Sequence, residues 1–181
     1  MLDSYTSVII NKLNNFLLKK YNKTEIIKLV NNIELHDKIQ ENYKNKILMN
    51  IVDIKREEND ISHDYYEMYG NQYIRKIKPA HFYIYAIFHS THLEKNITDG
   101  LLYLSDIISY INSNPILSSE NTIEFKEKNL SEINLYIQND EQNLYKKLKI
   151  PYMPSIILKY GLIPIDSLSQ NEKPITSISD F

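Results

Sequence analysis

The chain has 181 residues, of which 43% are hydrophobic and 24% charged, and these are the proportions of a globular domain with its own core. Lys and Arg number 21 against 23 Asp and Glu. This balance gives no strong field toward nucleic acid or an anionic membrane, and we expect no nucleic-acid partner. The absence of cysteine excludes disulfide scaffolds, thiolate metal sites and cysteine nucleophiles. No stretch approaches the about 20 apolar residues of a membrane span, so direct membrane insertion is not expected.

The N-terminal part is predicted to contain one helix and two strands. Residues 2–21 should form an amphipathic helix that packs on a sheet, because its opposite face is not strongly basic. Residues 25–34 and 46–54 are strand candidates. The apolar residues of the helix recur at three- and four-residue spacing: Leu2, Tyr5, Ile9, Leu13, Phe16 and Leu17.

The middle of the chain combines an irregular segment with a strong strand. Residues 55–76 are rich in charge and tyrosine without a clear period, and we interpret them as a long exposed excursion. Pro79–Phe88 has apolar residues on both faces of a two-residue alternation. That pattern predicts a central strand covered on two sides.

Residues 97–111 are predicted to form the strongest helix. Asn96 can cap its start with Asp99 as the acidic partner of a capping box, and Asn114 and Pro115 should end it. The expected apolar stripe runs through Ile97, Leu101, Leu104, Ile108 and Ile111.

The C-terminal part is predicted to be mostly strand. Thr122–Glu127 and Glu132–Ile137 should pair through a hairpin at 128–131, and a short helix should follow from Asp140 to Leu148. Ser155–Ile163 is a further strand. We therefore expect an α/β (α+β) fold with a mixed, mostly antiparallel sheet flanked by helices, formed by residues 1–165, and a flexible C-terminal arm over residues 166–181.

The histidines raise the possibility of a metal-dependent hydrolase. His36–Asp37 and His63–Asp64 are His–Asp dipeptides, and His81, His89 and His92 are close in sequence. A strand places residues three apart on opposite faces, however, so we interpret these as surface or edge histidines. The carboxylates Glu57, Glu58 and Asp60 stand in a solvated charge run. We assign no catalytic residue, no metal site and no cofactor, and keep the hydrolase as an alternative.

The tyrosine-rich excursion and the polar arm favour an assembly protein. Tyr65, Tyr66 and Tyr69 can supply a contact surface, since tyrosine offers a large area with a polar tip. Ile175 and Ile178 alternate in the arm and can add to the edge of another subunit's sheet.

The order of motifs resembles the DUF4255 domain of the Pvc16 family. The resemblance covers residues 1–165, and Tyr145, Lys149 and the pair Lys159–Tyr160 depart from the usual pattern. The segments that carry it are KILMNIVDIKREEN, KPAHFYIYAIFHSTH, LLYLSDIISYINSNPILSSENT and INLYIQNDEQNLYKKLKIPYMPSIILKY.

The resemblance implies a tail-terminator-like fold and a structural role. That family supplies the cap of phage-tail-like contractile injection systems, a homohexameric ring on the end of the inner tube that also contacts the last sheath layer. The implied partners are thus further copies of this chain, the tube protein and the sheath protein. Assembly is expected in the cytoplasm as part of the particle, with later release outside the cell left open. The chain would be a minimal form of such a cap. The alternative within the same particle is an adaptor or baseplate component.

Overall fold

A computed structural model describes residues 2–30, 43–57, 65–69, 72–76, 80–92, 96–138, 153–165 and 174–175. The backbone alone is described for 65–69, 72–76 and 174–175. The helices are α1 (Leu2–Tyr21), α2 (Ile97–Ser113) and α3 (Ile123–Glu127). The strands are β1 (Ile27–Leu29), β2 (Ile47–Arg56), β3 (Tyr65–Tyr69), β4 (Gln72–Lys76), β5 (Ala80–Ser90), β6 (Ile116–Leu117), β7 (Ile133–Gln138), β8 (Ser155–Ile165) and β9 (Pro174–Ile175).

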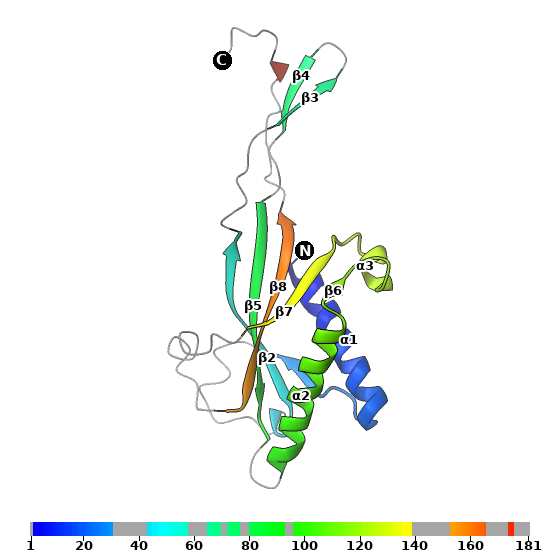
Figure 1. The fold of residues 1–181 in the computed structure, drawn as a ribbon, viewed down its shortest axis with the longest axis vertical. Helices are drawn as coiled ribbons and strands as arrows, with labels where there is room; N and C mark the ends of the chain where they lie inside the picture. The colour runs from blue at the N-terminus through cyan, green and yellow to red at the C-terminus, as the bar shows by residue number, and fades with distance from the viewer. Residues whose placement is uncertain are drawn as a thin grey trace.

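The strands form two sheets. A six-stranded sheet has the order β1-β2-β5-β8-β7-β6, and β1 and β2 are parallel while every other pair is antiparallel. A three-stranded antiparallel sheet has the order β3-β4-β9. The expected mixed, mostly antiparallel sheet with flanking helices is confirmed. Figure 1 shows α1 and α2 side by side along the large sheet, and the small sheet beyond the start of β5 and the end of β8.

The core lies between the helices and one face of the six-stranded sheet, which we call the inner face. Ile84, Ala86 and Phe88 of β5 point inward by their two-residue alternation and pack with buried residues of α1, α2 and α3. The fully buried side chains of Ile84 and Phe88 each contribute about 1.5–3 kcal/mol to folding. The Thr6 Oγ1 and Tyr160 hydroxyl groups lie 2.7 Å apart, which joins α1 to β8 inside this core.

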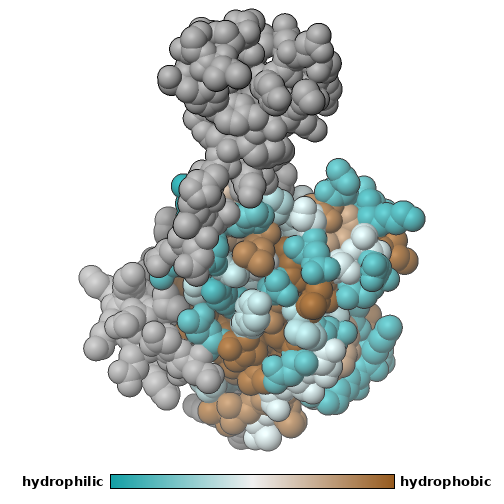
Figure 2. All heavy atoms as spheres, turned by 45° about the horizontal axis from the view of Figure 1, so that its top comes forward, coloured by the Kyte–Doolittle hydropathy of each residue, from teal (hydrophilic) through white to brown (hydrophobic). Residues whose placement is uncertain are grey.

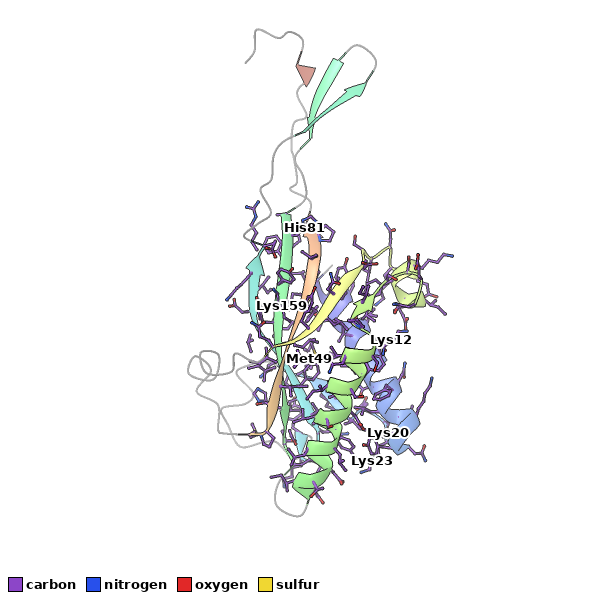
Figure 3. All side chains as sticks on the ribbon, in the orientation of Figure 1. Lys12, Lys20, Lys23, Met49, His81 and Lys159 are labelled. Atoms are coloured by element: carbon purple, nitrogen blue, oxygen red, sulfur yellow. The ribbon has the colours of Figure 1, made fainter. Side chains whose placement is uncertain are left out.

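Polar contacts fix the C-terminal end of α1 against α2. Asp106 accepts hydrogen bonds from Lys20 Nζ at 2.6 Å and from the Tyr21 hydroxyl at 2.5 Å. Lys23 Nζ donates to the Tyr103 hydroxyl at 3.0 Å, and Figure 3 shows Lys20 and Lys23 at this end of the helix pair. Burial and the Asp106 carboxylate raise the pKa of Tyr21 to about 12.

The buried face of α2 differs from the predicted stripe. Leu104 and Ile111 are buried as expected, whereas Ile97 and Leu101 are 43% and 49% exposed. The helix instead turns Gly100, Tyr103 and Ile107 toward the sheet, together with Leu104 and Ile111. Gly100 explains the rotation, because its missing side chain lets α2 approach Ser90 and His92 at the end of β5. The capping box is also wrong: Asn96 makes no side-chain cap and donates to Asn45 Oδ1 at 3.2 Å.

Replacing Gly100 with alanine is expected to lower the free energy of unfolding by about 1–2 kcal/mol. The new Cβ would collide with Ser90 Oγ and lie 3.0 Å from His92 Cβ, and such overpacking costs about 1–3 kcal/mol. This overpacking cost would outweigh the gain of about 1 kcal/mol in helix propensity that alanine brings relative to glycine. Urea denaturation measures the loss, and Ser90→Ala in the same chain should recover part of it. A Gly100→Ala protein more stable than the parent would contradict this packing.

Two other segments also differ from their prediction. Residues 123–127 form α3, not a strand, so the hairpin at 128–131 is wrong and the antiparallel partners of β7 are β6 and β8. Phe125 of α3 is buried, with its ring 5.8 Å from the ring of Tyr5. Within the excursion, 65–69 and 72–76 are the paired strands β3 and β4. The helix predicted for 140–148 lies outside the described residues.

Candidate interaction surfaces

The predicted contact residues lie in the small sheet. Tyr65, Tyr66 and Tyr69 belong to β3, and Ile175 belongs to β9 opposite Tyr73 of β4. Ile178 lies outside the described residues. Because β4 pairs with β3 on one side and with β9 on the other, the structure brings the tyrosine-rich segment and the arm into one sheet. Their role as interfaces stays a prediction, as does the domain division after Ile165, the last residue of β8.

At one edge of the six-stranded sheet, an asparagine side chain makes hydrogen bonds to the backbone groups of the edge strand that point away from the neighbouring strand. The edge strand is β1, and on its inward side Ile47 N–H donates to the Ile26 carbonyl. On its outward side, Asn14 Nδ2 donates to the Ile27 carbonyl at 2.9 Å, and Ile27 N–H donates to Asn14 Oδ1 at 2.8 Å. The Asn14 amide thus replaces one residue of a neighbouring strand at this edge.

The opposite edge is closed in the same way. On the inward side of the edge strand β6, Leu135 N–H of β7 donates to the Pro115 carbonyl. On the outward side, Asn121 Nδ2 donates to the Ile116 carbonyl at 2.8 Å, and Ser118 N–H donates to Asn121 Oδ1 at 3.0 Å. Both edge strands are also short, with three residues in β1 and two in β6. Short, capped edges discourage the addition of a further strand.

The face of the six-stranded sheet opposite the core, the outer face, carries a cluster of tyrosine and lysine. Lys159 Nζ of β8 lies 3.6 Å from the centre of the Tyr83 ring, and Lys55 Nζ lies 5.2 Å from that of Tyr85. Lys159 lies near the middle of β8 (Figure 3). Burial and a hydrogen bond with Glu57 raise the pKa of Tyr83 to about 12.

Sequence reasoning missed this cluster because it treated both faces of β5 as apolar. The alternation of Tyr83 and Tyr85 with Ile84 and Ala86 is the signal that distinguishes the two faces. Figure 2 shows polar and apolar residues interspersed over one face of the described body. The outer-face tyrosines and lysines can make contacts that combine apolar area with charge.

The histidines that are described do not form a metal site. His89 is 0% and His92 3% exposed, so their interpretation as surface or edge residues is wrong. His92 Nδ1 lies 3.1 Å from Ser90 Oγ, and burial lowers the pKa of His92. Within the described ranges, no group of three or more His, Asp or Glu could hold a metal ion. The dipeptides His36–Asp37 and His63–Asp64 lie outside those ranges, as do Glu58 and Asp60.

His89 has an unusual environment for a polar side chain. It lies at the register position between Leu48 of β2 and Ser155 of β8, and neither of its ring nitrogens has a hydrogen-bond partner in the described structure. Burial lowers the pKa of His89 to about 4. Asn50, two residues from Leu48 on the same face, is also fully buried, and both atoms of its amide lack a partner there.

Among the helices that the structure describes, none combines the length and apolar character needed to cross a membrane. This agrees with the polar residues on both described long helices. α1 carries Asp3, Lys19 and Lys20 near its ends, and α2 carries Asp99 in its first turn.

Comparison with known proteins identifies both a family and a fold. The sequence profile of the Pvc16 N-terminal domain matches residues 6–177. No curated protein sequence matches the chain. One similar solved structure is the sheath/tube terminator of an extracellular contractile injection system, PVC, in its extended state, with a TM-score of 0.53 and 11% identity over 94% of this chain and 61% of that one.

A second similar structure is the tube-terminating cap of the anti-feeding prophage. Its TM-score is 0.52 and its identity 12%, over 93% of this chain and 58% of that one. The chain therefore spans about three fifths of the length of these two proteins. At such low identity the likeness concerns the fold, and it confirms the expected terminator-like architecture.

Proposed function

Because the chain belongs to the Pvc16 N-terminal domain family, we propose that it is a structural cap of a phage-tail-like contractile injection system. The observation that carries the proposal is a match to that family over residues 6–177, together with a fold shared with a tube terminator and a tube-terminating cap. In this role the protein makes and breaks no covalent bond. Its chemistry consists of surfaces that complement a tube, a sheath and other copies of itself.

We infer that copies of the chain form a ring, with six as the number expected from the family. A ring requires two different surfaces of one subunit that contact each other between neighbours. The small sheet with Tyr65, Tyr66 and Tyr69 supports one such surface, and the outer-face cluster around Lys159 and Tyr83 supports a second. The ring would assemble in the cytoplasm on the inner tube. Its arm, with Ile175 and Ile178, would add to the edge of another subunit's sheet, and the part of the arm beyond Ile175 would contact the sheath.

The proposal is tested by adding the purified chain to growing inner tubes. Tubes formed with the protein should be shorter, and gold-labelled protein should lie at one end of each tube in electron micrographs. Label at the baseplate end of complete particles would instead support an adaptor. Unchanged tube length with no label at either end would contradict the cap.

Deleting residues 166–181 is expected to leave a folded protein that no longer caps particles bearing a sheath. The deletion removes β9 but leaves every strand and helix that contributes to the main core. Its thermal transition should therefore stay within a few degrees of the full chain, since a loss of about 1 kcal/mol shifts it by roughly 2–8 °C. Circular dichroism provides the folding control. Normal capping by the truncated protein would show that the arm is not a contact.

A further inference from the structure

The two sheets differ in how their edges are protected. In the six-stranded sheet, the Asn14 and Asn121 side chains hold the outward backbone groups of Ile27, Ile116 and Ser118. A new strand at either edge would first have to break two hydrogen bonds to an asparagine amide. Strand addition between subunits is therefore disfavoured at this sheet.

The small sheet is different because the chain itself adds a strand there. β4 pairs with β3 along five residue positions, from Tyr65↔Lys76 to Tyr69↔Gln72. On its other side β4 pairs with β9 at two positions only, Tyr73↔Ile175 and Ile74↔Pro174. A ladder this short has a weakly specified register and a small free energy, and such strands are prone to exchange between copies.

The connection to β9 is long enough for exchange. β8 ends at Ile165 and β9 begins at Pro174. The residues between them can span roughly 30 Å when extended, at about 3.3–3.6 Å each. The pairing of β9 with β4 is the same whether both strands come from one copy or from two. Whether β9 pairs within its own copy or with a neighbour is then set by the local concentration of the neighbouring copy.

We propose that β9 is an exchanged strand: Pro174–Ile175 of one copy pairs with β4 of the next copy in the ring. Each copy donates β9 from one surface and accepts a strand at β4 on another, which is the heterologous, closing contact that a ring requires. Pro174 begins the donated strand, a position where its missing N–H is tolerated. This inference rests on the proposed function, because exchange requires copies that are held side by side.

The test uses a disulfide between Tyr73→Cys and Ile175→Cys in one full-length chain. The chain contains no cysteine, so every disulfide must come from the introduced pair. Directly opposed residues of an antiparallel pair have Cα atoms about 4.5–5.5 Å apart, within the range of a disulfide. After mild oxidation of the protein assembled on tubes, denaturing gels without reductant should show a ladder of linked copies that ends at the ring number.

The control is Met68→Cys with Ile175→Cys. Met68 is the β3 partner of Tyr73 and lies one strand farther from β9. Two strand spacings put the Cα atoms roughly 10 Å apart, too far for a disulfide. Whether or not β9 is exchanged, this pair should give monomers without a disulfide. A ladder from it would show that cysteines on colliding copies cross-link, and would overturn the assignment of β9 as an exchanged strand.

The outcomes separate this inference from the proposed function. A Tyr73→Cys/Ile175→Cys protein that binds tube ends but gives only monomers with an internal disulfide overturns the exchange and leaves the cap intact. A protein without substitutions that ignores tube ends overturns the proposed function whatever the gels show. A ladder from tube-bound protein supports both.

Discussion

Replacing Gly161 with alanine is expected to lower the free energy of unfolding by about 3 kcal/mol or more. Gly161 has φ of 157°, a conformation that residues with a Cβ rarely adopt. A Cβ there would collide with the Phe82 carbonyl oxygen and lie 2.8 Å from Tyr83 Cα. These are backbone atoms of β5, which is paired on both sides inside the sheet, so they cannot move without breaking the ladder.

The surroundings of Gly161 explain why a glycine is needed. The register between β5 and β8 shifts at Phe82 and Tyr83, so that Leu162 is an extra residue in β8 and forms a bulge. The Tyr83 ring lies over Gly161, where its Cδ1 would be 2.8 Å from a Cβ. Lys159 Nζ lies 3.6 Å from the centre of the same ring, so Gly161 also helps to position the outer-face cluster.

Urea denaturation followed by circular dichroism measures this loss, and Leu162→Gly is the matched control. Leu162 has φ of 65°, which costs an L-residue about 1–2 kcal/mol, and it is half-buried. Glycine relieves the strain but removes apolar contacts, so we expect Leu162→Gly to stay within about 1 kcal/mol of the parent. A Gly161→Ala protein as stable as the parent would mean that the bulge is not where the register places it.

The sequence predicted those elements in which local pattern and tertiary environment agree. The stripe of α1 is buried at Tyr5, Ile9 and Leu13, and the apolar residues on both faces of Pro79–Phe88 predict β5 as the central strand that it is. The buried side of α2 was not predictable from hydrophobicity alone. Gly100 carries almost no apolar area, yet the fit of its backbone against Ser90 and His92 decides which side of the helix faces the sheet.

The candidate surfaces were predicted only in part, for a similar reason. A tyrosine-rich segment suggests a contact, but composition does not reveal that β9 returns to pair with β4, because that pairing joins residues about a hundred positions apart. The two asparagine caps were also not visible, since asparagine is frequent along the chain and its role depends on which strand it meets. Residues 123–127 are too short for periodicity to separate helix from strand.

Lowering the pH from 7 to 4 is expected to remove on the order of 3 kcal/mol of stability through His89 alone. Burial lowers its pKa from the usual 6.5 to about 4 in the folded protein, so the unfolded chain binds the proton more tightly. The loss begins as the pH falls through 6.5 and is complete near 4, and each unit of pKa difference corresponds to about 1.4 kcal/mol. No described polar group offsets the charge, since neither ring nitrogen has a partner.

His89→Leu should therefore flatten the pH dependence of unfolding between pH 6.5 and 4 without reducing stability at pH 7. Leucine suits a position beside Leu48 and removes two unpartnered buried atoms, a replacement that is neutral or stabilising in other proteins. Urea midpoints at several pH values give the comparison with the parent. If His89→Leu instead keeps the parent's pH dependence, the imidazole of His89 is not the group that links unfolding to pH in this range. If the profile flattens, the outer face of the sheet around His89 is as dry as the full burial of the nearby side chains of Ile87 and Ile157 indicates.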